Sequence, residues 1–108
     1  MYQRRCTRYP VHFRSTLSTP KIPEGTGTAV DLSIRGCRVQ SLTPVIPGIH
    51  IKLSIDAPEP KSVIEVEQAV VRWVIGEEFG LEFTSIAPGQ FEQLTKVIQE
   101  LPSMPNRG

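Results

Sequence analysis

Short segments of alternating apolar and polar residues recur along this chain, with prolines and glycines between them. The clearest is residues 49–55, IHIKLSI, in which isoleucine and leucine alternate with His50, Lys52 and Ser54. Residues 11–17, VHFRSTL, follow the same order. A period of two fits a strand with one buried face, whereas an amphipathic helix repeats its apolar residues about every 3.6 positions. The chain is therefore predicted to be mainly β-structure.

Other segments also have the composition of strands: residues 28–32, 37–42, 62–75 and 79–84. In the first of them, Val30 and Leu32 are predicted to share the inward face. In the second, Cys37 and Val39 are predicted to point inward, with Arg38 outward. Prolines and glycines in STPKIPEGTG and DAPEPK predict loops or turns between strands.

The segment 62–75 changes its pattern partway along. Ile64 and Val66 share one parity, while the later apolar residues share the other, namely Val71, Trp73 and Ile75. A β-bulge or bend near Gln68 would turn both sets inward. Phe79, Leu81 and Phe83 then alternate in the next segment, so we expect the two segments to form a hairpin.

The last patterned segment, PGQFEQLTKVIQELP, has helical periodicity. Its apolar residues form one stripe, consisting of Phe91, Leu94, Val97, Ile98 and Leu101. Pro88 suits a first helical turn, and Pro102 ends the helix. About six strands with frequent turn signals favour a sandwich or a barrel, and in a chain of 108 residues barrel closure removes exposed edges. We predict a small antiparallel six-stranded β-barrel with a C-terminal helix over one open end or side.

No catalytic constellation is apparent, so the chain is predicted not to be an enzyme. His12 and His50 fall on outward strand positions, where a histidine is usually solvated. The acidic pairs, Glu65 with Glu67 and Glu77 with Glu78, are expected on the outer barrel face or in a turn. Phosphate-loop, dinucleotide-binding and zinc-protease motifs do not occur in the sequence.

Two cysteines, Cys6 and Cys37, are too few for a disulfide scaffold and lack zinc-site spacing, so we expect reduced thiols, no metal and no cofactor. No run approaches the roughly 18 apolar residues of a membrane span. The basic start is not followed by the apolar stretch of a secretory signal. We expect a cytoplasmic protein without membrane insertion.

The net charge is only +1, but its distribution is uneven. Residues 1–23 hold five basic residues and no acidic one, which favours a local anionic partner over a nucleic-acid polymer. Within this stretch Arg4 and Arg8 have the spacing RxxxR, with Arg5 between them. Taken alone, a basic run at a chain end is most often a solvated tail.

A second short motif, DLSIRG, contains Asp31, Ser33 and Gly36 at the spacing DxSxxG. On its own it is compatible with an Asx-type turn between strands, with Gly36 supplying a positive φ. With the RxxxR motif, the predicted barrel, the segments VRW and FGLEF, and a terminal helix, the whole chain resembles the PilZ domain family, whose members are bacterial receptors for cyclic di-GMP.

The resemblance implies a cyclic di-GMP site formed by both motifs. Arg4 and Arg8 match the ligand-binding arginines of the family, and Arg5 is expected to add a phosphate contact. Asp31 matches the acceptor for the N–H groups of guanine, Ser33 adds a hydroxyl, and Gly36 allows close backbone approach. Arginine suits this ligand because its planar fork pairs with phosphate oxygens and with guanine O6 and N7.

The chain is accordingly divided into an N-terminal ligand-binding arm at residues 1–9, the barrel with its helix at 10–101, and a tail at 102–108. We expect residues 1–8 to be mobile and to close over the ligand. Arg38 lies outside the motifs, and Arg38→Ala is expected to leave binding unchanged. A receptor without an output domain also requires an effector protein, which the sequence does not identify.

Two rival functions are compatible with the same fold. Some PilZ-like domains act through protein contacts without nucleotide, for example in pilus or flagellar control, although here both motifs are present. A barrel for single-stranded nucleic acid would need exposed aromatic platforms. Most aromatic residues of this chain are predicted to point inward, which leaves chiefly Tyr2 and Tyr9.

Overall fold

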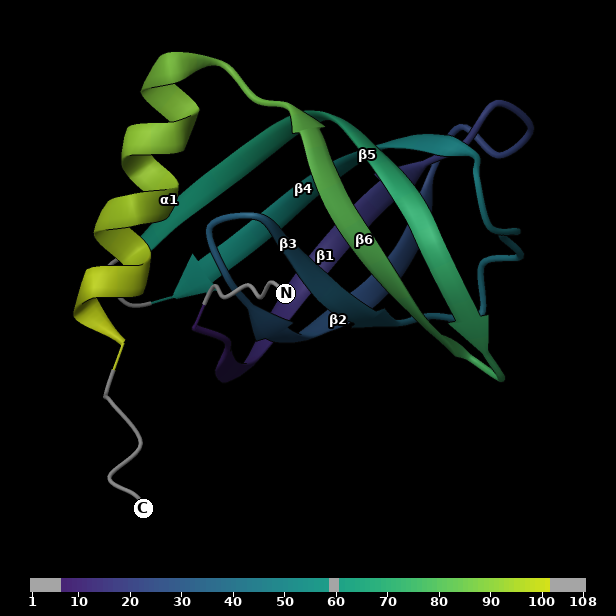
Figure 1. Cartoon of the computed structure of the whole chain (residues 1–108), viewed down its shortest axis with the longest axis horizontal. Helices are drawn as coiled ribbons and strands as arrows, with labels where there is room; N and C mark the ends of the chain where they lie inside the picture. The colour runs from purple at the N-terminus through teal and green to yellow at the C-terminus, as the bar shows by residue number, and fades with distance from the viewer. Residues whose placement is uncertain (1–6, 59–60, 102–108) are drawn as a thin grey trace, which may run out of the picture.

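The computed structural model describes residues 7–58 and 61–101 and confirms the predicted fold class. The strands and the helix are β1 (Tyr9–Ser18), β2 (Gly25–Leu32), β3 (Gly36–Gln40), β4 (His50–Pro58), β5 (Lys61–Ile75), β6 (Glu78–Ser85) and α1 (Pro88–Glu100). The strands form a closed antiparallel barrel in the order β1-β2-β3-β6-β5-β4, and α1 lies beside one end of it (Figure 1).

Closure occurs where the C-terminal half of β1 pairs with β4. Ser15 is opposite Ile55, and Leu17 is opposite Leu53. On its other side β1 pairs with β2, and this pairing places Pro10 opposite Asp31. The start of β1 and the end of β2 therefore lie side by side at one rim of the barrel.

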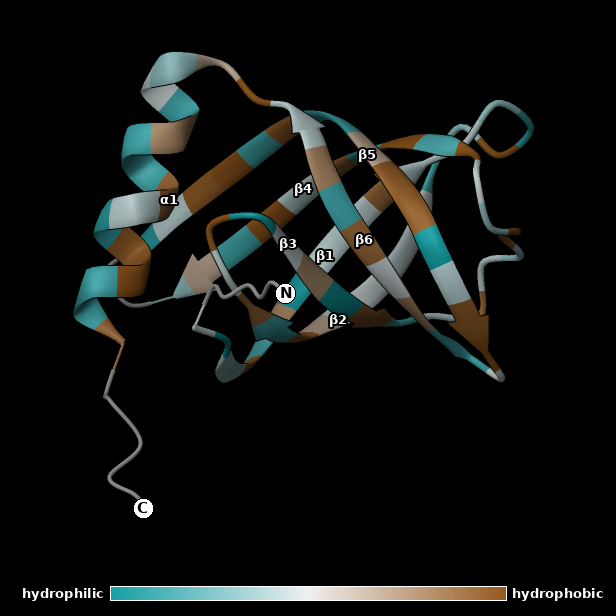
Figure 2. Cartoon of the chain, viewed as in Figure 1, coloured by the Kyte–Doolittle hydropathy of each residue, from teal (hydrophilic) through white to brown (hydrophobic). Residues whose placement is uncertain are grey.

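The core follows the predicted alternation in β1 and β4. Phe13 and Leu17 are buried while His12 and Arg14 are exposed, and in β4 the side chains of Ile51, Leu53 and Ile55 are all buried. Figure 2 shows the resulting alternation of hydrophobic and hydrophilic residues along the strands. Burial of these apolar side chains, at roughly 25 cal/mol per Å², is the main stabilising contribution to the barrel.

The predicted inward face of β2 is wrong at Val30. The register with both neighbouring strands shifts beside this residue, so that Ala29 and Leu32 are fully buried and Val30 is only half-buried. A bulge inserts one residue into the alternation and changes its parity. Its consequence for the site is that Asp31 pairs directly with Arg38 of β3.

Strand β5 has the predicted irregularity at Gln68 and a second one that was not predicted. The first shifts the register between Gln68 and Ala69, and the second lies between Val71 and Trp73. After the second shift, the side chains of Trp73 and Ile75 are 37% and 73% exposed, contrary to their predicted inward positions. Val74 packs against the core instead.

Helix α1 begins at Pro88 and buries Leu94 and Val97 completely. It packs on β5, where the backbone N–H of Glu65 donates to Gln90 Oε1 at 2.8 Å and the Gln93 side chain donates to Ser62. Phe91, which belongs to the predicted apolar stripe, is exposed. Within the described part of the chain, no helix has the length and apolarity needed to cross a membrane.

Candidate functional site

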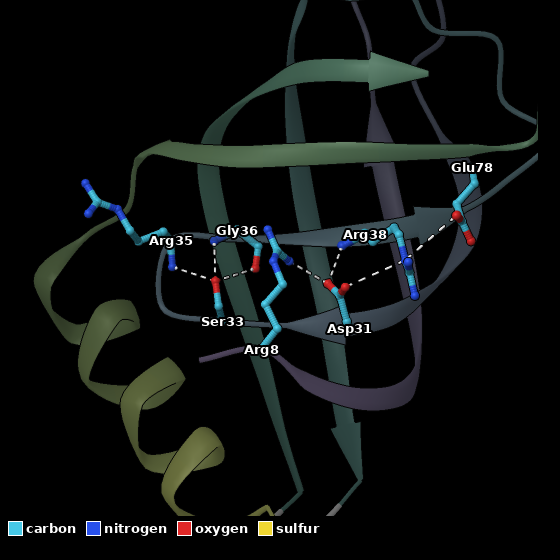
Figure 3. Close-up of polar contacts among 7 residues, drawn as sticks. All are labelled: Arg8, Asp31, Ser33, Arg35, Gly36, Arg38 and Glu78. Atoms are coloured by element: carbon cyan, nitrogen blue, oxygen red, sulfur yellow. Dashed lines mark hydrogen bonds and ion pairs between the residues drawn. The ribbon is translucent and has the colours of Figure 1, made fainter. Parts of the chain in front are cut away.

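The turn between β2 and β3 is organised by the hydroxyl of Ser33. Ser33 Oγ accepts the backbone N–H groups of Arg35 at 3.1 Å and Gly36 at 3.2 Å and donates to the Gly36 carbonyl at 3.3 Å. The side chain is buried, and the Arg35 carbonyl accepts the N–H of Phe83 from β6. Ser33 therefore fixes the turn, and its hydroxyl is already occupied by these partners (Figure 3).

Gly36 is required by close packing between strands. A Cβ built at this position would lie 2.1 Å from the backbone oxygen of Leu81 on β6. The positive-φ glycines of the described chain are Gly48 and Gly76, so the positive φ considered for Gly36 is not the reason for this residue. Gly36 brings β3 against β6 and so holds the turn next to the rim.

Asp31 and Arg8, which belong to the two separate motifs, meet at this rim. Arg8 Nη1 donates to Asp31 Oδ1 at 2.7 Å, although the residues are 23 positions apart in the sequence. The side chain of Asp31 is 14% exposed and that of Arg8 is 52% exposed. The pair thus joins a nearly buried carboxylate to a guanidinium that remains largely in solvent.

Arg38, which lies outside both motifs, also contacts Asp31. Its backbone N–H donates to Asp31 Oδ1 at 3.0 Å, and its Nε is 3.6 Å from Asp31 Oδ2. The same Nε is 3.8 Å from Glu78 Oε1 on β6. A single sequence motif does not reveal this contact, because it depends on the pairing of β2, β3 and β6.

A surface hollow lies next to the Arg8–Asp31 pair. Its lining consists of Arg8, Arg35, Arg72, Trp73, Gly80, Leu81 and Glu82. The indole of Trp73 covers Gly80, where any Cβ would overlap the ring, and Arg72 forms an ion pair with Glu82. The hollow therefore combines an exposed aromatic ring with arginines, which suits a planar anionic ligand. Sequence reasoning missed it because Trp73 was predicted to point inward.

Some predicted site residues lie outside the described residues. These are Arg4 and Arg5, and Cys6, which was not predicted as a site residue, also lies outside the described residues. Of the predicted set, the structure brings Arg8 and Asp31 into contact and places Ser33 and Gly36 in the adjoining turn. Among residues 7–58 and 61–101, no cluster of histidine, cysteine, aspartate and glutamate side chains could hold a metal ion.

Cys37 lies at the base of the site but is chemically protected. It is fully buried in the barrel core, directly after Gly36. Burial raises the pKa of its thiol well above the ordinary range, and the nearby carboxylate of Asp31 acts in the same direction. The thiolate is the reactive form of cysteine, so this residue belongs to the core and not to the ligand-binding surface.

The described residues thus form a small closed barrel with an arginine–aspartate pair and a serine–glycine turn at one rim. The PilZ domain family model matches residues 2–100. This match covers nearly the whole chain, and the chain therefore belongs to the PilZ domain family.

Similar solved structures have the same fold. The PilZ domain of YcgR from Escherichia coli, with c-di-GMP, has a TM-score of 0.74 and 16% identity over 92% of its length and 93% of this chain. The PilZ domain of CeSA from a cellulose-synthesizing bacterium has a TM-score of 0.67 and 12% identity over 95% of its length and 86% of this chain.

The inhibitor of motility MotI/DgrA from Bacillus subtilis is similar over 92% of this chain, with a TM-score of 0.73 and 22% identity. The match covers 51% of that protein, so this chain spans about half of its length. At such identities the similarities establish the fold. No curated protein matches the sequence.

Proposed function

We propose that this protein is a receptor for cyclic di-GMP, binding the nucleotide at the rim where Arg8 meets Asp31. The observation that carries the proposal is the 2.7 Å contact between these residues, because it unites the RxxxR and DxSxxG motifs in space. The similar fold of the YcgR domain, solved with c-di-GMP, supports the choice of ligand.

The chemistry of the rim complements both parts of the ligand. Guanine presents O6 and N7 acceptors, which the planar fork of Arg8 can pair with, and N–H donors, for which the Asp31 carboxylate is an acceptor. The phosphates require cations, and Arg4 and Arg5 are proposed to supply further contacts. Trp73, in the neighbouring hollow, offers an aromatic face beside Arg8 and Arg35.

We expect ligand binding to change the hydrogen-bond partners of the Asp31 carboxylate. In the free protein Asp31 Oδ1 already accepts both Arg8 Nη1 and the Arg38 backbone N–H, so a guanine edge that pairs with both carboxylate oxygens requires Arg8 to turn to the ligand. Because Arg8 is half exposed and directly precedes β1, this movement does not disturb the core. We propose that residues 1–8, which precede β1, form the closing arm.

Ser33 and Gly36 act in this proposal as positioning residues. The Ser33 hydroxyl holds the turn, and Gly36 keeps the turn against β6. Both therefore fix the place of Asp31 relative to the hollow. Their role in binding is to keep the rim preorganised, which reduces the entropy that binding must overcome.

The bound state is proposed to be relayed to an effector protein in the cytoplasm, because ordering of the arm changes the surface around the rim. An adaptor that works without nucleotide is the alternative within the family. The exposed Trp73 also gives a single-stranded nucleic acid one stacking platform, but such binding normally uses several aromatic side chains along a basic groove.

Titration calorimetry with three ligands tests the proposal. We expect cyclic di-GMP to bind and cyclic di-AMP to bind far more weakly, because adenine has no N1–H for Asp31 to accept. A single-stranded oligonucleotide is the third ligand. Absence of any heat with cyclic di-GMP would overturn the receptor function, and equal binding of both dinucleotides would overturn guanine recognition by Asp31.

A further inference from the structure

We propose that Arg38 is a positioning residue of the nucleotide site, which holds the Asp31 carboxylate in place after Arg8 turns to the ligand. This inference rests on the proposed function. Arg38 lies outside both sequence motifs, and its role follows from the contacts that β2, β3 and β6 create at the rim (Figure 3).

Arg38 approaches both oxygens of the carboxylate. Its backbone N–H donates to Asp31 Oδ1 at 3.0 Å, and its Nε lies 3.6 Å from Asp31 Oδ2. Arg8 contacts Oδ1 alone and belongs to the segment just before β1. The contact from Arg38 therefore originates in the sheet and can persist when the contact from Arg8 is lost.

The Nε–H of Arg38 has capacity for a stronger bond. This nitrogen is buried and has no hydrogen-bond partner among the described residues. It lies between two carboxylates, at 3.6 Å from Asp31 and 3.8 Å from Glu78. Pairing of a buried donor stabilises the protein, so departure of Arg8 favours a shift of Asp31 Oδ2 toward Arg38 Nε.

Charge gives a second reason for this role. Cyclic di-GMP carries two negative phosphates, and an uncompensated Asp31 carboxylate would repel it. Once Arg8 pairs with the ligand, Arg38 is the remaining cation in contact with Asp31 among the described residues. Glu78, which accepts a hydrogen bond from Gln40 at 3.3 Å, supports Arg38 from the opposite side.

Three variants separate the role of Arg38 from a general charge effect. Arg38→Gln should weaken cyclic di-GMP binding by about 10-fold, the lower end of what a charge-assisted contact contributes. Arg38→Lys should recover part of the affinity because it restores the cation. Arg14→Gln is the matched control, since Arg14 is exposed on β1 and forms no ion pair among the described residues.

A double-mutant cycle tests whether Arg38 acts through Asp31. The variant with both Asp31→Asn and Arg38→Gln should bind about as weakly as Asp31→Asn alone. If the two losses instead multiply, Arg38 acts independently of Asp31 and the inference is wrong. A loss of affinity in Arg14→Gln equal to that in Arg38→Gln would also overturn it.

A ligand-free measurement keeps the inference separate from the proposed function. In the NMR spectrum of the free protein, Arg8→Ala should shift the Arg38 Nε–H proton downfield, as its bond to Asp31 strengthens, and adding Asp31→Asn should abolish the shift. An unmoved Arg38 signal would overturn the positioning role even if cyclic di-GMP binds. If the signal moves but the wild type does not bind, the receptor function alone fails.

Discussion

Arg8 and Asp31, separated by 23 positions in the sequence, lie 2.7 Å apart between Nη1 and Oδ1 at the rim of the barrel. Neither residue is held there by local sequence. The pairing of β1 with β2 places Pro10 opposite Asp31, and this register brings the preceding arginine to the carboxylate. The contact is the structural link between the two predicted motifs.

Arg8→Ala and Asp31→Ala should each weaken cyclic di-GMP binding by about 10- to 100-fold, the effect of one lost charge-assisted hydrogen bond. The melting temperature of Arg8→Ala should change little, because an ion pair with a half-exposed arginine contributes only about 0–1 kcal/mol. Asp31→Ala should lower it, because the Arg38 backbone N–H then loses its acceptor. Calorimetric titration and thermal melting measure the two effects. Arg14→Ala is the control, and affinity equal to wild type in both site variants would contradict the assignment.

Trp73 should report binding through its fluorescence. It is the single tryptophan of the chain, is 37% exposed and lines the hollow beside Arg8. A guanine that enters the hollow would stack on the indole and quench its emission. We expect saturable quenching by cyclic di-GMP and none by cyclic di-AMP, and an emission spectrum unchanged by saturating cyclic di-GMP would place the ligand away from Trp73.

Gly36→Ala should destabilise the fold by about 1–3 kcal/mol, the usual cost of overpacking, because the new methyl would overlap the Leu81 carbonyl. Urea unfolding gives the free energy directly. Gly89→Ala is the matched control, since a Cβ there meets nothing within 4 Å and alanine favours the helix. Equal stability of the two variants would show that β3 and β6 can separate at little cost.

Cys37 should resist thiol reagents in the folded protein. Burial raises the pKa of its thiol, so at pH 8 it stays protonated, whereas in the unfolded chain its pKa is about 8.5. The associated stability is present below about pH 8.5 and is lost as the pH rises above it. In a Cys6→Ser variant, an aromatic disulfide reagent should react only after denaturation, and rapid reaction under native conditions would contradict this burial.

The N-terminal arm should become more protected when ligand binds. Hydrogen exchange of the backbone amides of residues 3–9 is expected to slow with cyclic di-GMP, while exchange in α1 stays the same. This expectation follows from the proposed movement of Arg8 from Asp31 to the ligand. Equal protection of the arm with and without ligand would remove the closing step but leave nucleotide binding itself intact.

Sequence alternation predicted the buried faces of some strands but not of others. Alternation correctly assigned the buried faces of β1 and β4, because the pleat of a strand fixes side-chain direction within a few residues. The same rule failed at Val30 and Trp73, which follow or adjoin register shifts. The irregularity near Gln68 was predicted because the apolar residues change from even to odd positions there. The second shift in β5 is not accompanied by such a change in the sequence.

The site residues likewise fall into those that the sequence predicted and those that only the structure identified. The two motifs and the family resemblance together predicted Arg8, Asp31, Ser33 and Gly36 as site residues, and the structure brings Arg8 and Asp31 into contact. The contact of Arg38 with Asp31 was missed, because it depends on cross-strand pairing and on Glu78 from β6. The ligand contacts of all these residues stay predictions, and Arg4 and Arg5 lie outside the described residues.

By itself the sequence determined that the chain forms strands and a terminal helix and that it carries the two motifs. Residue periodicity and motif spacing can be read from short stretches of sequence. Only the tertiary structure decided that Arg8 meets Asp31, that Arg38 joins them and that Trp73 faces solvent. These relationships depend on strand register, which bulges and remote partners set together. One extra residue in a strand shifts its register and so changes which side chains lie opposite each other on the neighbouring strand.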